Sequence, residues 1–228
     1  MLLGMEDLLV TSSSTLPHVP SVYTPCYCEE NVYFLCKELW KAKVADSEGR
    51  DLFVVFISNA DRQVPFWCQK SGKGADGLVV WDYHVICVQR SGEDSDSIQV
   101  WDLDSKLPFP VTLSRYINEA IRPLFPLNPK FRRLFRVVHA PIYLRSFASD
   151  RRHMKDNQGN WISSPPLYQP IIAKDGTVNN LDMFIGMNEE NVHSNVEELI
   201  KGVFCQKFGV VMVETDLEDF FSRTQWQS

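Results

Sequence analysis

The chain has 228 residues and a mass of 26.3 kDa, which is enough to bury a core without disulfide or metal support. Hydrophobic residues make up 44% and charged residues 23%, a balance that excludes a wholly disordered chain and a collagen or coiled-coil architecture. The formal net charge of −6 argues against sequence-independent binding of nucleic acid, and no apolar run approaches the ~20 residues of a membrane-spanning helix. We therefore expect neither nucleic acid nor a membrane among the partners.

The beginning of the chain differs in composition from the rest. Residues 1–21 are rich in Ser, Thr and Pro and show no sustained hydrophobic period, so we predict a flexible tail over 1–21 and a single folded domain over 22–228. The start, MLLGMEDLLV, lacks a basic region and carries Glu6 and Asp7, which is unlike a signal peptide. Six cysteines in a chain of this length do not make a disulfide framework. We expect a reducing compartment, the cytoplasm, with the nucleus as a second candidate.

The predicted elements mix helices and strands. The first is a helix over about residues 29–42, because its apolar residues recur with helical spacing. Runs rich in Val, Ile, Phe and Trp then predict strands over 52–58, 64–69, 78–90 and 97–103. The rest of the pattern predicts a helix over 113–122, a strand over 135–140, a helical turn near 143–148, an irregular segment over 149–180, and helices over 181–187 and 194–203. A capping box, Thr215-x-x-Glu218, predicts a last helix that ends near Ser222. Together these elements predict an α+β fold.

One thiol lies at the start of a predicted helix. A free thiol with a pKa of about 8.5 is only a few per cent thiolate at pH 7, so a nucleophilic cysteine needs help. Cys28 precedes the first helical turn, whose unpaired N–H groups lower the pKa of a thiol. Glu29 and Glu30 oppose a thiolate, so a histidine partner would have to outweigh them. Cys26 is the rival thiol, and it is the weaker candidate because it lies outside the helix.

A histidine and an acid on two consecutive strands could complete such a site. His84 and Asp102 lie equally far from Glu93, in the middle of a turn-forming stretch. If the strands form an antiparallel hairpin centred there, the two side chains face each other, with Cβ atoms ~4.5–5.5 Å apart. A one-residue slip would move Asp102 to the other face of the sheet. Asp104 is the alternative acid, because the period of two keeps it on the same face.

Several stretches carry a resemblance to a known family. In order, they read CYCEENVYFLC (26–36), VVFISN, VVWDYHV, WDLDSKLPFP, FRRLFRV and FASDRRHMKDNQGNW. The chain resembles the protein N-terminal glutamine amidohydrolase family from about Val22 to Trp161, and more weakly beyond. The resemblance implies that Cys28 is the catalytic nucleophile, His84 its base and Asp102 the acid that orients the base. It also implies a papain- or transglutaminase-like core, in which the nucleophile-bearing helix packs on an antiparallel sheet.

The function that the resemblance implies is deamidation. The side chain of an N-terminal glutamine would become glutamate with release of ammonia, which feeds the N-degron pathway. The partners would be proteins and peptides with a free N-terminal Gln, without a cofactor, and the chain would be a monomer. One alternative is a transglutaminase- or protease-like cysteine enzyme with the same triad. Another is a non-catalytic module that binds N-terminal residues and uses Cys28 only for packing.

Specificity for an N-terminal residue requires a group that replaces the water around its α-ammonium. The acidic candidates are not ranked by the sequence: Glu29, Glu30, Asp82 and Asp150. The Cys-x-Cys pair has no second pair at zinc spacing, so we expect no metal.

The remaining charged groups suggest structural roles. We expect His139 and His153 to be structural or surface residues. A basic cluster, expected to form a solvated and ion-paired face, comprises Lys130, Arg132, Arg133 and Arg136.

Overall fold

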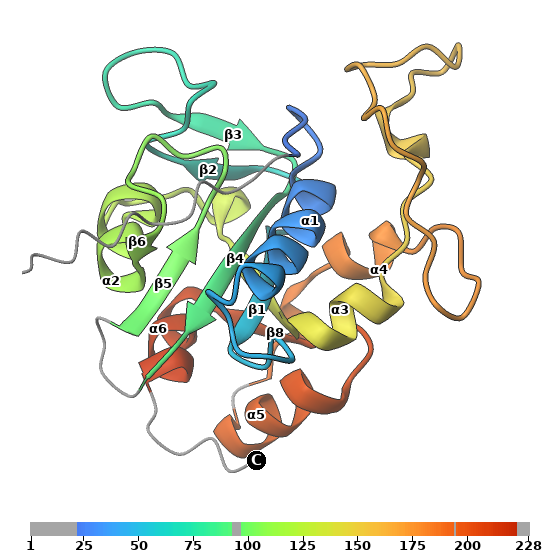
Figure 1. The fold of residues 1–228 in the computed structure, drawn as a ribbon. Coiled ribbons are helices and arrows are strands. Elements are labelled where there is room, and N and C mark those ends of the chain that lie inside the picture. Colours follow the sequence, from blue (N-terminus) through green and yellow to red (C-terminus); the bar gives the residue numbers. More distant parts are fainter. Residues whose placement is uncertain (1–21, 93–96, 194, 223–228) are drawn as a thin grey trace, which may run out of the picture.

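The structure is a computed structural model, and it describes residues 22–92, 97–193 and 195–222 (Figure 1). The flexible tail predicted over residues 1–21 lies outside the described residues. No helix in the described part of the chain is long and apolar enough to cross a membrane.

A six-stranded sheet forms the centre of the molecule. Its strand order is β6-β5-β4-β1-β7-β8, and every neighbouring pair is antiparallel. The strands are β1 (Leu52–Ser58), β4 (His84–Arg90), β5 (Ile98–Trp101), β6 (Val111–Thr112), β7 (Leu134–His139) and β8 (Val210–Val213). A second, two-stranded antiparallel sheet consists of β2 (Val64–Phe66) and β3 (Val79–Trp81).

Helices cover both faces of the central sheet (Figure 1). On one face lie α1 (Cys28–Lys41), α3 (Ala140–Ser146) and α4 (Leu181–Ile185). On the other lie α2 (Leu113–Tyr116), the π-helical turn Ile117–Ile121 that continues it, α5 (Val196–Cys205) and α6 (Glu214–Ser222). Because both faces are covered, the central strands are apolar on both sides, and every residue of β1 is buried. The predicted α+β class is confirmed.

The run predicted as one strand over 78–90 is two strands in different sheets, so that prediction was wrong. β3 pairs with β2, whereas β4 pairs with β1 and β5. Between them, the side chain of Asp82 accepts a hydrogen bond from the backbone N–H of Tyr83 at 2.9 Å. Such a local side-chain bond competes with ladder pairing and separates the two strands. His84 is consequently the first residue of β4, at one end of the sheet.

Two other predictions need correction. The capping box does not form, because α6 begins at Glu214 and Thr215 is inside the helix. The basic cluster is only partly solvated: Lys130 and Arg132 are exposed, but the remaining two arginines are buried. Arg136 donates to three backbone carbonyls, and Arg133 pairs with Glu214 at 2.8 Å.

The predicted irregular segment over 149–180 is largely without regular structure. It contains a short 3-10 turn, Arg152–Met154, and its distal part projects from the body of the molecule, in yellow and orange in Figure 1. Its first residues are buried beside α1, as described below.

The turn before β8 depends on a glycine. Gly209 has φ +60°, and a Cβ there would lie 2.0 Å from the carbonyl oxygen of Val137 in β7. Gly176 has φ +86° but open space around the same position. We expect Gly209→Ala to lower the free energy of unfolding by at least about 2 kcal/mol more than Gly176→Ala, because only the first adds a backbone clash to the cost of positive φ. Urea denaturation of both variants measures this, and equal losses would contradict it.

Candidate active site

The first turn of α1 places the Cys28 thiol. Cys28 is the first residue of the helix and is partly exposed. The loop before it is clamped to the helix, since the side chain of Asn31 accepts from the N–H of Thr24 at 2.9 Å and donates to its carbonyl at 2.8 Å. This clamp holds the chain at the start of α1, and the helix packs against β4.

His84 and Asp102 form a buried hydrogen-bonded pair. His84 Nε2 lies 3.0 Å from Asp102 Oδ1, and both side chains are 1% exposed. Burial alone would lower the pKa of His84, but the charge of Asp102 and its hydrogen bond outweigh burial and raise it. For Asp102, burial is likewise outweighed by the charge and hydrogen bond of His84, so its pKa is lowered. An ionised Asp102 accepts the proton of Nε2, which leaves Nδ1 of His84 as the nitrogen that can accept a proton.

The surroundings hold this pair in place. Asp102 also accepts hydrogen bonds from Tyr116 at 2.8 Å and Gln69 at 3.3 Å, and from the backbone N–H of Asp104 at 2.9 Å. The indole of Trp81 stacks on the His84 ring at 5.7 Å between centroids. Gln69 and Tyr116 lie far from Asp102 or on other elements, and the sequence pattern did not identify either of them.

The predicted hairpin register is shifted by two residues. The structure pairs Cys87 with Trp101 and Val88 with Val100, so the centre lies one residue beyond Glu93. His84 and Asp102 are therefore not directly opposed, and Asp102 follows the last residue of β5. A shift of two keeps both side chains on the same face, and they still reach each other diagonally. Of the two acids that the sequence offered as partners of His84, Asp102 forms the hydrogen bond with the imidazole, and Asp104 does not.

The thiol lies beside the residue that follows His84. A backbone hydrogen bond from Val85 reaches Cys28 and favours its thiolate. Burial, followed by the charges of Glu29, Asp104 and Asp82, nevertheless raises the pKa of Cys28 well above its ordinary value. Burial, and after it the nearby carboxylates, therefore outweighs the lowering of this pKa that was expected from the helix start. Such a thiol needs a base to remove its proton.

Metal binding at this pair is possible by distance alone. One ligand atom each from His84, Asp102 and Asp104 lies within 4.8 Å of the others. A metal ion would, however, have to replace the hydrogen bonds that Asp102 already accepts. The absence of a metal remains a prediction from the sequence.

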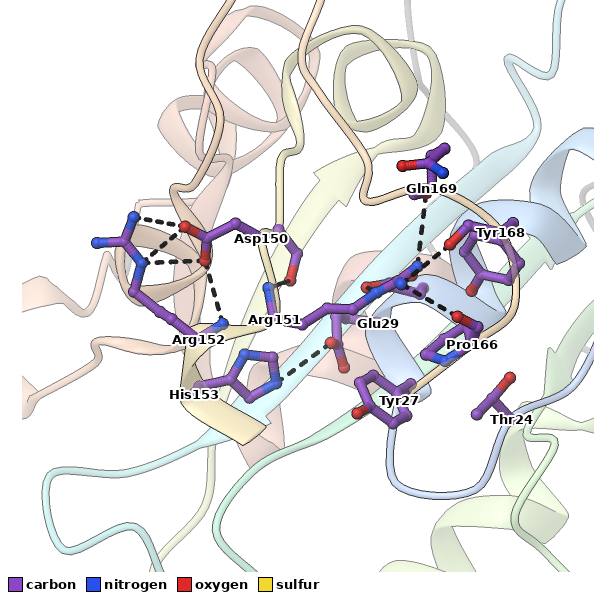
Figure 2. A network of polar contacts seen from close by, with 12 residues as sticks. Thr24, Tyr27, Glu29, Asp150, Arg151, Arg152, His153, Pro166, Tyr168 and Gln169 are labelled. Carbon is purple, nitrogen blue, oxygen red and sulfur yellow. Dashed lines mark hydrogen bonds and ion pairs between the residues drawn. The ribbon is translucent and has the colours of Figure 1, made fainter. Parts of the chain in front are cut away.

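The second glutamate of α1 is neutralised by the irregular segment. Arg151 forms two hydrogen bonds with Glu30, at 2.8 and 2.9 Å, and the two side chains are 5% and 0% exposed. Figure 2 shows Arg151 extending towards the carbonyl groups of Pro166, Tyr168 and Gln169, which also accept from it. Neighbouring Arg152 points away and pairs with Asp150 (Figure 2).

The first glutamate of α1 is in direct contact with the thiol. Cys28 Sγ lies 3.8 Å from Glu29 Oε2, which also accepts from the Tyr83 hydroxyl at 2.9 Å. Its other oxygen lies 3.5 Å from Nε2 of His153 and has no hydrogen-bond partner among the described residues. Burial raises the pKa of Glu29 to about 8, which reduces its charge near neutral pH. His153, expected to be structural or on the surface, thus belongs to the surroundings of the site (Figure 2). His139 has a structural role, since its Nε2 forms a hydrogen bond of 3.0 Å with the backbone carbonyl of Arg50.

The structure combines a thiol at a helix start, next to the backbone of Val85, with a buried imidazole–carboxylate pair that includes the preceding residue, His84. These are the groups that enzymes with a nucleophilic cysteine use. The model of the N-terminal glutamine amidase family matches residues 23–221. Similar proteins are the protein N-terminal glutamine amidohydrolase of Oryza sativa subsp. indica, 53% identical over 88% of this chain and 87% of that protein, and that of Arabidopsis thaliana, 51% identical over 88% and 91%. The protein of the same name from Drosophila melanogaster is 40% identical over 82% and 87%. The chain belongs to the N-terminal glutamine amidase family.

The two neighbouring arginines provide a matched test of the buried ion pair. Arg151→Gln leaves Glu30 buried without its partner, so we expect the free energy of unfolding to fall by about 3–5 kcal/mol. Arg152 is 67% exposed, and Arg152→Gln should cost less than about 1 kcal/mol. Urea denaturation compares the two, and similar losses would mean that the pair with Glu30 is not structurally important.

The burial of Glu29 predicts a pH effect on stability. The pKa of Glu29 is about 8 in the folded protein against 4.5 ordinarily, so its full contribution is present below pH 4.5 and is lost as the pH rises to about 8. Over this range, the unfolded chain releases the proton that the folded chain retains. We expect the free energy of unfolding of Glu29→Gln, relative to the unsubstituted protein, to rise by up to about 1.4 kcal/mol per pH unit. Denaturation at pH 5, 6, 7 and 8 measures this difference, and a constant difference would refute a raised pKa.

Proposed function

We propose that the protein is a cysteine amidohydrolase that deamidates the side chain of an N-terminal glutamine to glutamate and releases ammonia. The observation that carries this function is membership of the N-terminal glutamine amidase family, with more than half of the aligned residues identical to relatives that bear the amidohydrolase name. The arrangement of Cys28, His84 and Asp102 supplies the groups that such chemistry needs.

In the first half of the reaction, Nδ1 of His84 takes the proton of the Cys28 thiol. The thiolate attacks the carboxamide carbon and forms a tetrahedral oxyanion. The backbone N–H of Cys28 at the helix start would stabilise the oxyanion, and the N–H of Val85, which already reaches the sulfur, is the second donor we propose. One such donor is worth about 2.7–4 kcal/mol. The carbon–nitrogen bond then breaks, and His84 gives its proton to the departing ammonia.

In the second half, water resolves the γ-glutamyl thioester. His84 removes a proton from the water as it attacks, the carbon–sulfur bond breaks, and the Cys28 sulfur regains a proton. Asp102 keeps the imidazole in the tautomer with the proton on Nε2 and stabilises the imidazolium in both halves. No oxidant, nucleotide or metal takes part in these steps.

The wider biological setting follows from the product. The substrates would be proteins and peptides with a free N-terminal Gln, and the product, an N-terminal Glu, is available for arginylation in the N-degron pathway. We further propose that residues 22–228 are a single catalytic domain that acts as a monomer in the cytoplasm, with the nucleus as a second location. A papain- or transglutaminase-like core is supported by α1 packing on an antiparallel sheet that carries the histidine.

Three peptides of one composition test the activity. They carry a free N-terminal Gln, an N-acetylated Gln, or a Gln at an internal position. Ammonia release and a mass gain of about 1 Da should occur only with the first peptide, since a thioester hydrolysed by water replaces an amide with an acid. Reaction at internal Gln would instead indicate a transglutaminase-like enzyme. A folded protein that reacts with none would be a binding module.

Substitutions in the triad test the mechanism. Cys28→Ala should abolish turnover, His84→Ala should nearly abolish it, and Asp102→Asn should lower kcat by roughly 10²- to 10⁴-fold, because the imidazolium loses its counter-charge. Cys26→Ala is the matched control, since Cys26 is the neighbouring exposed thiol. Steady-state ammonia release measures all four variants. An active Cys28→Ala variant would refute the mechanism, and an inactive Cys26→Ala variant would identify the other thiol as nucleophile.

A further inference from the structure

The proposed substrate places a positive charge close to the reacting atom. Four bonds separate the α-nitrogen of glutamine from its carboxamide carbon, so the two atoms are at most about 5 Å apart. A group that recognises the ammonium must therefore lie in the same cleft as the Cys28 thiol. An ammonium that leaves water needs a carboxylate or several carbonyl groups to replace its hydration.

Most carboxyl groups near the thiol are unsuitable for this task. Glu30 is paired with Arg151, and Asp150 is paired with Arg152. Glu29 is fully enclosed, and burial keeps it largely protonated at neutral pH.

Two carboxylates remain, and they differ in how firmly they are held. Asp82 is exposed, and one of its oxygens accepts from the backbone of the next residue. Asp104 is partly buried, and its Oδ1 accepts from the hydroxyl of Tyr23 at 2.6 Å. Its backbone is anchored on both sides, by the carboxylate of Asp102 at 2.9 Å and by the N–H of Lys70 at 2.7 Å.

Asp104 also lies beside the reacting groups. One of its carboxylate oxygens is within 4.8 Å of a ring nitrogen of His84. Its charge acts on the Cys28 thiol more strongly than that of Asp82. Among the described residues, Asp104 forms no salt bridge, so this partly exposed and rigidly held charge lacks a cationic partner.

We propose that Asp104, oriented by the hydroxyl of Tyr23, binds the α-ammonium of the substrate's N-terminal residue. The proposal rests on the proposed function and adds the residue that makes the enzyme specific for chain ends. A site built around an ionic hydrogen bond discriminates against a substrate that lacks the donor, because the carboxylate then loses water without gaining a partner. An internal glutamine has an amide at this position and carries no charge there.

The test compares two peptides that differ only in the α-amino group. One begins with Gln, and the other begins with a 4-carbamoylbutanoyl group, which is glutamine with hydrogen in place of the amine. The ratio of kcat/KM for the two peptides reports recognition of the ammonium. Asp104→Asn should lower kcat/KM for the Gln peptide by roughly 10- to 100-fold and change kcat/KM for the desamino peptide by less than about 3-fold. The ratio of kcat/KM for the Gln peptide to that for the desamino peptide should therefore fall sharply.

Two further variants separate anchoring from a structural role. Tyr23→Phe keeps the charge of Asp104 but removes the hydroxyl that orients it, so the ratio should fall by roughly 3- to 10-fold. Asp82→Asn removes the neighbouring exposed charge and should leave the ratio unchanged. Circular dichroism and thermal unfolding verify that each variant is folded. If Asp104→Asn does not fold, Tyr23→Phe still tests the proposal.

The possible failures are distinguishable. Equal losses for both peptides in Asp104→Asn would mean that Asp104 only supports the catalytic pair, and this would overturn the proposal. A collapse of the ratio in Asp82→Asn alone would move the anchor to Asp82. An unsubstituted protein that deamidates both peptides equally well does not recognise the ammonium, which also overturns it. An unsubstituted protein that deamidates neither refutes the proposed function itself.

Discussion

The first turn of α1 buries two carboxyl groups directly behind a thiol, and much of the surrounding structure follows from this constraint. Two buried negative charges would cost several kcal/mol each and would oppose a thiolate. Arg151 in the irregular segment compensates the charge of Glu30 by pairing with it, and three backbone carbonyls hold Arg151 in place. The charge of Glu29 is removed by protonation, which burial favours. A long segment without regular structure thereby becomes a structural part of the site.

The end of the sheet sets the geometry of the remaining groups. The break between β3 and β4 makes His84 the first residue of its strand, and β5 ends at the residue before Asp102. Both side chains are therefore at one end of the sheet, where α1 also begins. Because Tyr116, Gln69 and Trp81 converge on this pair from other elements, the imidazole has little freedom to change its orientation or tautomer.

The charge around the thiol connects reactivity with substrate choice. In the free protein, the charges of Asp104 and Asp82 add to burial in raising the pKa of Cys28. If Asp104 holds the substrate's ammonium, then binding places a positive charge among the same groups and offsets their effect on the thiolate. The thiol would become more reactive when the correct chain end is bound, which spends binding energy on the chemical step rather than on affinity alone.

The sequence by itself determined a helix directly after the Cys28 region, the strands β1, β4, β5 and β7 of the central sheet but not β6 and β8, and the pairing of His84 with Asp102. These features depend on local periodicity and on a period-two alternation that a shift of two residues leaves intact. Only the tertiary structure decided the division of residues 78–90 between two sheets, the burial of Arg133 and Arg136, the place of His153 beside Glu29, and the position of Asp104 near His84. Each of these depends on contacts between residues far apart in the chain, and burial and electrostatics act through such contacts rather than through neighbours in sequence.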